Sequence, residues 1–369
     1  MKQQPRKIKI REFIAIMISV IGAKATEDTP VGIYNQVQNA AWMIPILTGI
    51  LFILPLFLLL KTLSLFEGKG LFQGIQLIFG KSIGFVVCLI VFFMHTSVVS
   101  FDARTYSDII RSFYFPTTPY LVISGILMFV CAYGAKKGIE HIGSVAYLVV
   151  FYLMISLSVA WMLSLQDTSL DAIFPLLGTG GMEILKTSTL RFNLYVEFIV
   201  AALLIPYMAS MKEFKKGTWF TLFFMIILLS SSILVYVCLF DRSIDAIGFP
   251  FHTLIRYISL GNFLSNVEVL FFPVWIIGSF IRFSVAIYFG ALMFGQIFKI
   301  KDFEYLIPAL TLIYLLIGFI PEAPADVSVD YKPIIRDIAG YTYVTLAFLI
   351  WIVALLKGDF KHAKKKTSL

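Results

Sequence analysis

The chain contains 369 residues, of which 59% are hydrophobic, 16% aromatic and only 14% Asp, Glu, Lys or Arg. A soluble protein carries about 25% charged residues, so this composition excludes a soluble enzyme, a nucleic-acid-binding protein and a secreted disulfide scaffold. A membrane-spanning helix needs about 20 predominantly apolar residues. We therefore expect one all-α, polytopic integral membrane domain over residues 1–369, with the lipid bilayer around it.

Six runs without charged residues are long enough to cross a bilayer. They cover residues 41–60, 83–101, 112–135, 142–166, 217–240 and 338–356. Residues 305–321 form a shorter apolar run, and residues 269–298 form a long one that only Arg282 interrupts.

Two further segments, residues 13–23 and 190–208, are predicted as membrane helices although polar residues interrupt them. They are the first and sixth of ten helices, which divides the chain into five-helix halves over residues 11–165 and 189–357. Because five is odd, the halves must be inverted, and interrupted helices at matching places in such repeats indicate a central binding site. We expect helices one and six to be discontinuous; the alternative is an ordinary bundle with two weakly hydrophobic helices.

With ten spans, most of the 30 Lys and Arg residues fall on the side of the N-terminus. The positive-inside rule then predicts that both termini are cytoplasmic, and the basic N-terminal segment is predicted to be a tail rather than a cleaved signal peptide. Cys88, Cys131 and Cys238 lie in apolar runs without the spacing of a disulfide or metal site. No metal or cofactor is expected.

Lys24 is a charged residue in a predicted membrane helix, where each charge costs about 2.5–3.5 kcal/mol on insertion scales. It follows Gly22 and Ala23, where glycine allows the backbone to leave helical geometry. It lies about 20 Å along a helix from Arg11, which is past mid-membrane. We expect Lys24 to line a cavity at a backbone break; the alternative is a lysine that snorkels from a short helix end.

Glu197 lies in the sixth predicted helix, four residues after Asn193, at a depth similar to that of Lys24. An ion pair or a shared ligand would offset the burial of both charges. The alternative is that Glu197 is a structural hydrogen-bonding partner only.

Arg282, next to Ile281, interrupts the eighth predicted helix. A guanidinium binds a carboxylate through two hydrogen bonds, so Arg282 is predicted to hold an anionic ligand group or to pair with Glu197. Glu268 is too far away, about 21 Å along the helix. His95 is a candidate for proton transfer, but a lone histidine is more often a hydrogen-bonding group between helices.

Asp102, Arg104, Asp108 and Arg111 predict that the third helix continues beyond the bilayer with structural i,i+4 and i,i+3 ion pairs. Residues 69–79 are amphipathic and are predicted to lie in the membrane interface. The sequence has no HExxH, GxSxG or P-loop motif, so no enzymatic activity is predicted.

Several short motifs, in their order and spacing, resemble those of the B-subunit permeases of bacterial spore germinant receptors, within the amino acid–polyamine–organocation superfamily. They are the arginine-bearing segment 101–111 that leads to Thr118-Pro119, the loop 173–178, Glu197 followed by Pro206-Tyr207, and the stretch from Phe249 to Trp275. Two positions depart from the family: Lys24 stands where a small residue is frequent, and Val196 where glycine is frequent.

The resemblance implies ten helices in two inverted halves, with a small-molecule pocket between helices one, three, six and eight. It also implies a germinant receptor of the spore inner membrane, in which this chain acts beside an A subunit and a lipoprotein C subunit. Germinants of the family are amino acids, sugars or nucleosides. The predicted function is germinant sensing by binding. The alternative is a proton-coupled amino-acid transporter, with Glu197 carrying the proton and Lys24 in a cation site.

The predicted ligand-binding residues are Gly22, Ala23, Lys24, Asn193, Glu197, Ile281 and Arg282. Two cations and one anion among them leave one buried positive charge uncompensated, which is costly. That imbalance favours a ligand with a carboxylate, such as an amino acid. A neutral ligand is the alternative if Glu27 or Asp28 folds back towards Lys24.

Overall fold

The structure, a computed structural model, describes residues 7–66, 68–258, 268–324 and 326–360. Over these ranges the chain forms helices and no β-strand. The α-helices are α1 (Ile10–Gly22), α2 (Thr29–Val37), α3 (Met43–Leu63), α4 (Leu71–Phe79), α5 (Lys81–Phe113), α6 (Tyr120–Lys136), α7 (Ile139–Ser164), α8 (Gly181–Leu190), α9 (Glu197–Val200), α10 (Met211–Phe240), α11 (Pro250–Tyr257), α12 (Glu268–Phe298), α13 (Ile307–Gly318) and α14 (Lys332–Leu356). The prediction of an all-α fold is therefore confirmed.

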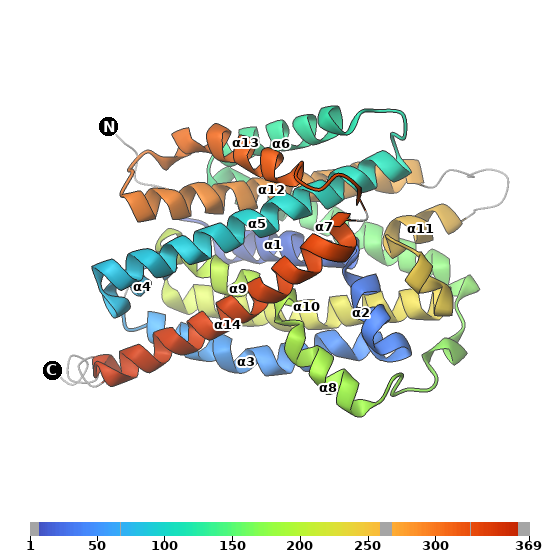
Figure 1. Ribbon diagram of the computed structural model, residues 1–369, viewed down its shortest axis with the longest axis horizontal. Coiled ribbons are helices and arrows are strands. Elements are labelled where there is room, and N and C mark those ends of the chain that lie inside the picture. Colours follow the sequence, from blue (N-terminus) through green and yellow to red (C-terminus); the bar gives the residue numbers. More distant parts are fainter. Residues whose placement is uncertain (1–6, 67, 259–267, 325, 361–369) are drawn as a thin grey trace.

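Long apolar helical segments identify an integral membrane protein. Among the described residues, six segments are long and apolar enough to cross a membrane, namely Thr29–Leu63, Lys81–Phe113, Ile139–Asp167, Met211–Ala246, Glu268–Phe298 and Asp326–Leu356. Three shorter apolar helical segments accompany them, Tyr120–Lys136, Glu197–Tyr207 and Phe303–Gly318. Most of these helices run along the long axis of the bundle, while α5 and α14 cross it obliquely (Figure 1).

The helix α1 lies inside the bundle, against α7, α10 and α12. Small residues on its neighbours allow this close approach. A Cβ added to Gly217 of α10 would lie 2.8 Å from the ring of Phe13, and one added to Gly143 of α7 would lie 3.2 Å from Glu12. Larger side chains at these two positions would overlap with the first turns of α1, so the two helices could not pack as tightly against it.

The helix contacts in the two halves of the chain follow one scheme. In the first half, α1 contacts α7. The corresponding contact in the second half is that of the 3-10 turn η5 (Phe192–Leu194) with α14. Across the halves, α1 contacts α10, as η5 contacts α3. Likewise, the contacts of α12 with α7 and α6 correspond to those of α5 with α14 and α13.

Both ends of the described chain lie at the same end of the bundle (Figure 1). The backbone N–H of Ile8 donates to the carbonyl of Tyr207, 2.9 Å away, at the end of the 3-10 helix η6 (Ala201–Tyr207). The helix α4 contacts both η6 and α14 at this end. The ammonium of Lys61 lies 5.7 Å from the ring of Phe360, which follows α14.

The amphipathic segment predicted for the membrane interface forms α4, but its apolar side faces protein. Leu71, Phe72, Ile75 and Ile78 are fully buried, and α4 packs against α5 and η6. The apolar side of α4 thus packs against protein, and its location in the membrane interface stays a prediction.

The helix α5 continues to Phe113, as the sequence predicted. Arg104 and Asp108 form the expected i,i+4 ion pair at 3.1 Å, and the Arg104 guanidinium lies 4.0 Å from the centre of the Tyr120 ring. Asp108 pairs with Arg104 rather than with Arg111. The cysteines are buried, as predicted, and none is in a disulfide.

Candidate functional site

The helical segment that begins with α1, the first predicted membrane helix, is broken after Gly22. The α-helix ends at Gly22, and the chain continues as the 3-10 turn η1 (Ala23–Ala25) and a bend before α2. The Thr26 hydroxyl donates to the carbonyl of Ala23 (2.9 Å) and so satisfies an acceptor at the helix end. Because the helix is interrupted here, the side chains of Lys24 and Glu27 lie in the protein interior, and these residues are 5% and 0% exposed.

The sixth predicted helix is broken as well. After α8 ends at Leu190, the 3-10 turns η5 and η6 flank the single helical turn α9. The helix α14 approaches this break closely, because a Cβ added to its Gly340 would lie only 3.0 Å from the backbone nitrogen of Asn193. The carbonyl groups of Asn193 and Leu194 are directed to a side chain from the first break.

That side chain is Lys24, which joins the two breaks. Its ammonium lies 2.6 Å and 2.7 Å from the two carboxylate oxygens of Glu197. It also donates to the carbonyl oxygens of Asn193 (2.6 Å) and Leu194 (3.0 Å). The Lys24 side chain is 6% exposed and that of Glu197 is 21% exposed. Lys24 thus lies buried at the backbone break and pairs with Glu197, and it is not a snorkelling lysine. It is not among the residues that line the two cavities described below, although it was expected to line one.

A second group of charged side chains surrounds the break after α1. The carboxylate of Glu27 is fully buried and lies 2.7 Å from the guanidinium of Arg336 on α14. The ammonium of Lys332 and the guanidinium of Arg282 lie 3.6 Å and 3.8 Å from its other oxygen. Three cations from two helices thus face one carboxylate from the break in the first helix.

Two further carboxylates complete this group. Asp102 on α5 lies 2.5 Å from Arg282 and 2.9 Å from Arg336. Asp28 lies 2.7 Å from Lys332 and 3.3 Å from Arg336. Arg336 therefore bridges carboxylates from α5 and from the first helix break.

We call the eight residues the charged cluster: Lys24, Glu27, Asp28, Asp102, Glu197, Arg282, Lys332 and Arg336. Its four cations and four anions balance. This corrects two expectations. Arg282 pairs with Asp102 and Glu27 rather than with Glu197, and no unpaired positive charge is left for a ligand carboxylate. The cause is that Asp102 faces the protein interior, 6% exposed, instead of lying in a surface ion pair.

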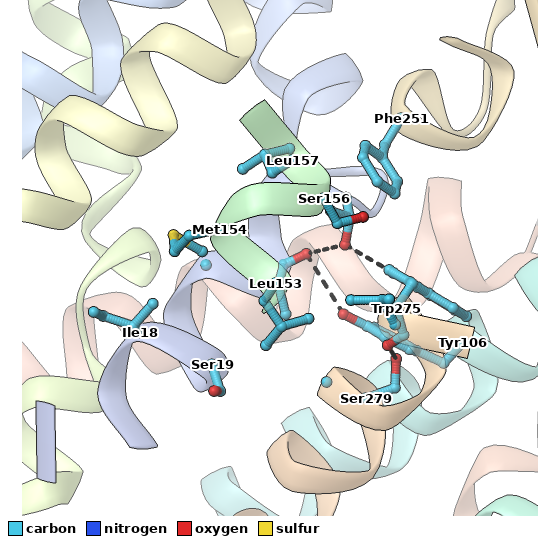
Figure 2. Close-up of a pocket in the computed structure, with 15 residues that line it drawn as sticks. Ile18, Ser19, Tyr106, Leu153, Met154, Ser156, Leu157, Phe251, Trp275 and Ser279 are labelled. Atoms are coloured by element: carbon cyan, nitrogen blue, oxygen red, sulfur yellow. Dashed lines mark hydrogen bonds between the residues drawn. The ribbon is translucent and has the colours of Figure 1, made fainter. Parts of the chain in front are cut away.

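An aromatic cavity of about 60 Å³ lies beside the first break, between α1, α5, α7, α11 and α12 (Figure 2). Gly22 and Ala23 line one side. On the other side the rings of Tyr106 and Trp275 stack with their centres 5.2 Å apart and their planes at 6°. The Trp275 indole N–H donates to the Thr26 hydroxyl at 3.0 Å, which ties this aromatic pair to the break.

A second cavity, of about 70 Å³, lies next to the ion pairs. Apolar side chains form most of its lining, and we call it the polar cavity only after the charged side chains on its wall. Its walls include Asp102, Glu197, Arg282, His95 and the ring of Tyr343. The Nε2 of His95 donates to a carbonyl of α12, 2.8 Å away, so this histidine is a hydrogen-bonding group between helices. Carboxylates and a guanidinium on one cavity wall can bind an ammonium and a carboxylate of the same small molecule.

The structure brings most of the predicted site residues together. Gly22 and Ala23 line the aromatic cavity, whereas Glu197 and Arg282 line the polar cavity. Lys24 meets the Asn193 carbonyl between the two breaks. Ile281 is buried, but it lines neither cavity.

Sequence reasoning missed the contribution of α14. Lys332 and Arg336 precede the apolar run 338–356, so the ten-helix count places them among the basic residues on the outer side of the membrane. The structure buries Lys332 (2% exposed) and leaves the Arg336 side chain only 12% exposed. Their i,i+4 spacing, which places them on one helix face, was the available signal. Asp102 and Tyr106 have the same spacing on α5, and both contact Arg282.

Broken helices that meet at buried charges in an all-helical membrane bundle define a permease-like integral membrane protein. A family model described as spore germination protein matches residues 7–327. This chain belongs to that family of permease-like spore germination proteins.

Curated relatives come from Bacillus subtilis (strain 168). Spore germination protein B2 is 23% identical over 97% of this chain and 98% of its own length. Spore germination protein A2 is 24% identical over 96% of this chain and 98% of its own length. Spore germination protein YndE is 23% identical over 94% of this chain and 96% of its own length. The similarity thus extends over nearly the full length of each pair.

Proposed function

We propose that this protein is the germinant-sensing membrane subunit of a spore germination receptor and that it binds a small molecule, an amino acid, in a mid-membrane pocket. On this proposal it acts without catalysis, beside A and C subunits, in the spore inner membrane with both termini cytoplasmic. The names of the relatives and the match over residues 7–327 support the receptor assignment.

The bridge from Lys24 to Glu197 is the observation that carries the proposal. It joins both helix breaks, and each break borders a cavity. A ligand that enters the polar cavity reaches Glu197 and Arg282 directly, and so acts on the contact that holds the two broken helices together. Binding energy is thereby coupled to a change in helix position, which is what a sensor requires.

The paired helix contacts support two five-helix repeats. The contacts of α1 with α7 and α10 have counterparts in those of η5 with α14 and α3. The contacts of α12 with α6 and α7 have counterparts in those of α5 with α13 and α14. The two breaks occupy corresponding places, at α1 and at η5–α9. With five helices in each half, the repeats would be inverted and the bundle would contain ten membrane helices.

The balanced charges of the cluster favour a ligand without net charge, because an added charge would be buried uncompensated. A zwitterionic amino acid meets that condition. Its ammonium and carboxylate also complement Glu197 and Arg282 on the wall of the polar cavity. A sugar also has no net charge, but its hydroxyl groups can give Glu197 and Arg282 only neutral hydrogen bonds, which are weaker than charge-assisted ones. The cavity volume of about 70 Å³ favours a small amino acid.

Spore germination tests this proposal. Spores that carry this protein as their only receptor subunit of its type are exposed to single amino acids or single sugars, and germination is followed by loss of optical density. We expect a response to an amino acid that Glu197→Gln and Arg282→Gln each abolish. A wild-type response to sugars alone would refute the amino-acid assignment.

A proton-coupled amino-acid transporter is the second candidate. The ammonium of Lys24 lies among four oxygen atoms, as a coupling cation would, and the side chain of Glu197 is 21% exposed, which leaves it accessible to a proton. Flux of a labelled amino acid into proteoliposomes distinguishes the two. A sensor binds without net flux, whereas a transporter accumulates the amino acid when a proton gradient is imposed.

A further inference from the structure

We propose that the groove between α6 and α13 is a binding site for an anionic phospholipid, with one acyl chain in the groove and the headgroup on Lys136 and Lys137. This site is separate from the germinant pocket and does not depend on the proposed function. The two helices pack side by side at one edge of the bundle (Figure 1). The groove between them has a volume of about 430 Å³.

The groove is apolar along its length. Its lining includes Gly125, Phe129, Ala132 and Leu312, and the ring of Phe129 is 73% exposed. A Cβ added to Gly125 would have no atom within 4 Å, so the small residue leaves open space at this point. An apolar channel on the lipid-facing side of a membrane protein is filled by hydrocarbon, because water there would lose its hydrogen bonds.

The length of the groove matches one leaflet. From Gly125 to Lys136, α6 rises about 16 Å, at 1.5 Å per residue, and the lining also extends from Leu315 to Pro308 on α13. Half of a hydrocarbon core about 30 Å thick is about 15 Å. A single acyl chain therefore fits from the bilayer centre to the lysine end of the groove.

Charge is placed at only one end of this groove. Lys136 lines the groove at the C-terminus of α6, and Lys137 follows it. The ammonium of Lys137 lies 4.9 Å from the centre of the Tyr133 ring, which is also part of the lining. In the part of the chain that the structure describes, neither ammonium has a carboxylate partner. Two unpaired cations at the membrane surface attract an anionic headgroup.

The test uses the purified full-length protein, delipidated in detergent and mixed with equal amounts of phosphatidylglycerol and phosphatidylcholine of the same acyl chains. Retained lipid is counted by native mass spectrometry. We expect the wild type to retain phosphatidylglycerol preferentially. Lys136→Gln with Lys137→Gln should weaken that retention about fivefold for each lysine, whereas the control Lys212→Gln with Lys216→Gln, which removes the same charge from α10, should not.

A second variant tests the apolar part of the site. Gly125→Leu fills the open space on α6, so it should reduce retention of both lipids while the melting temperature confirms an intact fold. Equal retention of the two lipids by the wild type, or no greater loss in the double lysine variant than in its control, would overturn the proposal. Unchanged retention in folded Gly125→Leu would overturn the assignment of the acyl chain to this groove.

Discussion

The ammonium of Lys24 and the carboxylate of Glu197 are joined at 2.6 Å, although the two residues lie 173 positions apart and each lies at a break in its helix. The backbone carbonyls of Asn193 and Leu194 complete the shell around the ammonium. Removal of one partner from a buried pair costs about 3–5 kcal/mol, because the other charge stays buried and unpaired. This ion pair is therefore a strong contact between the two broken helices, in addition to the packing of α1 against α9 and of α2 against α8.

The substitution Lys24→Ala is expected to abolish the germination response while the protein still reaches the membrane. It leaves Glu197 and two carbonyl groups without their cation. Germination dose–response curves and immunoblots of membrane fractions measure the two effects. A normal dose–response curve for Lys24→Ala would show that the bridge has no part in sensing.

A double variant separates loss of charge balance from loss of the bridge. Glu197→Gln in the Lys24→Ala background removes the unpaired carboxylate, so we expect it to recover part of the stability that Lys24→Ala loses. Thermal melting of the purified proteins measures this recovery. The double variant should remain inactive in germination, because the two breaks are still not joined.

Arg282 is expected to be coupled to Asp102 and not to Glu197. The first pair lies at 2.5 Å, within the range of a direct ion pair. Double-mutant cycles with Arg282→Gln, Asp102→Asn and Glu197→Gln should give a coupling energy of about 0.5–3 kcal/mol for the pair with Asp102. The cycle with Glu197 should give a smaller value. An equal or larger coupling to Glu197 in melting experiments would contradict the observed pairing.

Arg336→Lys is expected to destabilise the protein although it preserves the charge. The guanidinium donates to Glu27, Asp102, Asp28 and the Thr29 hydroxyl at the same time. A lysine ammonium is a point charge without this planar geometry, and each lost hydrogen bond to a charged group is worth about 1.5–3 kcal/mol. Thermal melting should show a clear decrease for Arg336→Lys. The control is Arg242→Lys at an exposed position, which should melt like the wild type.

The helices were predictable because apolar length alone determines where a chain can span a bilayer. The predicted run 41–60 corresponds to α3 (Met43–Leu63), and the run interrupted by Arg282 corresponds to α12. The break at Gly22 was predictable for a similar local reason, since a polar stretch follows a short apolar one.

The partners within the charged cluster were not predictable, because they depend on contacts between distant segments. Asp28 and Arg336 are 308 residues apart in the sequence. A charge beside an apolar run normally marks the membrane surface, and this regularity placed Lys332 outside. The structure instead buries Lys332 against the carboxylate of Asp28, at 2.7 Å, and the packing of α14 against α3, α5 and η5 brings it there.

The topology gives a separate prediction. Both termini should be cytoplasmic, because the described ends of the chain lie at one end of the bundle and most basic residues fall on the N-terminal side. A reporter enzyme that is active only in the cytoplasm, fused after Leu369, should be active. Activity of an extracytoplasmic reporter at the same position would contradict this topology and would invert the assignment of each loop to the cytoplasmic or the outer side of the membrane.

Ligand binding by the purified protein tests the central claim most directly. Melting temperatures of the wild type and of Lys24→Ala are measured with each common amino acid and with neutral sugars, because a ligand that binds the folded state raises its stability. We expect at least one amino acid to raise the melting temperature of the wild type and to have no effect on Lys24→Ala. Stabilisation by sugars alone, or stabilisation by an amino acid that persists in Lys24→Ala, would contradict an amino-acid site at the junction of the two broken helices.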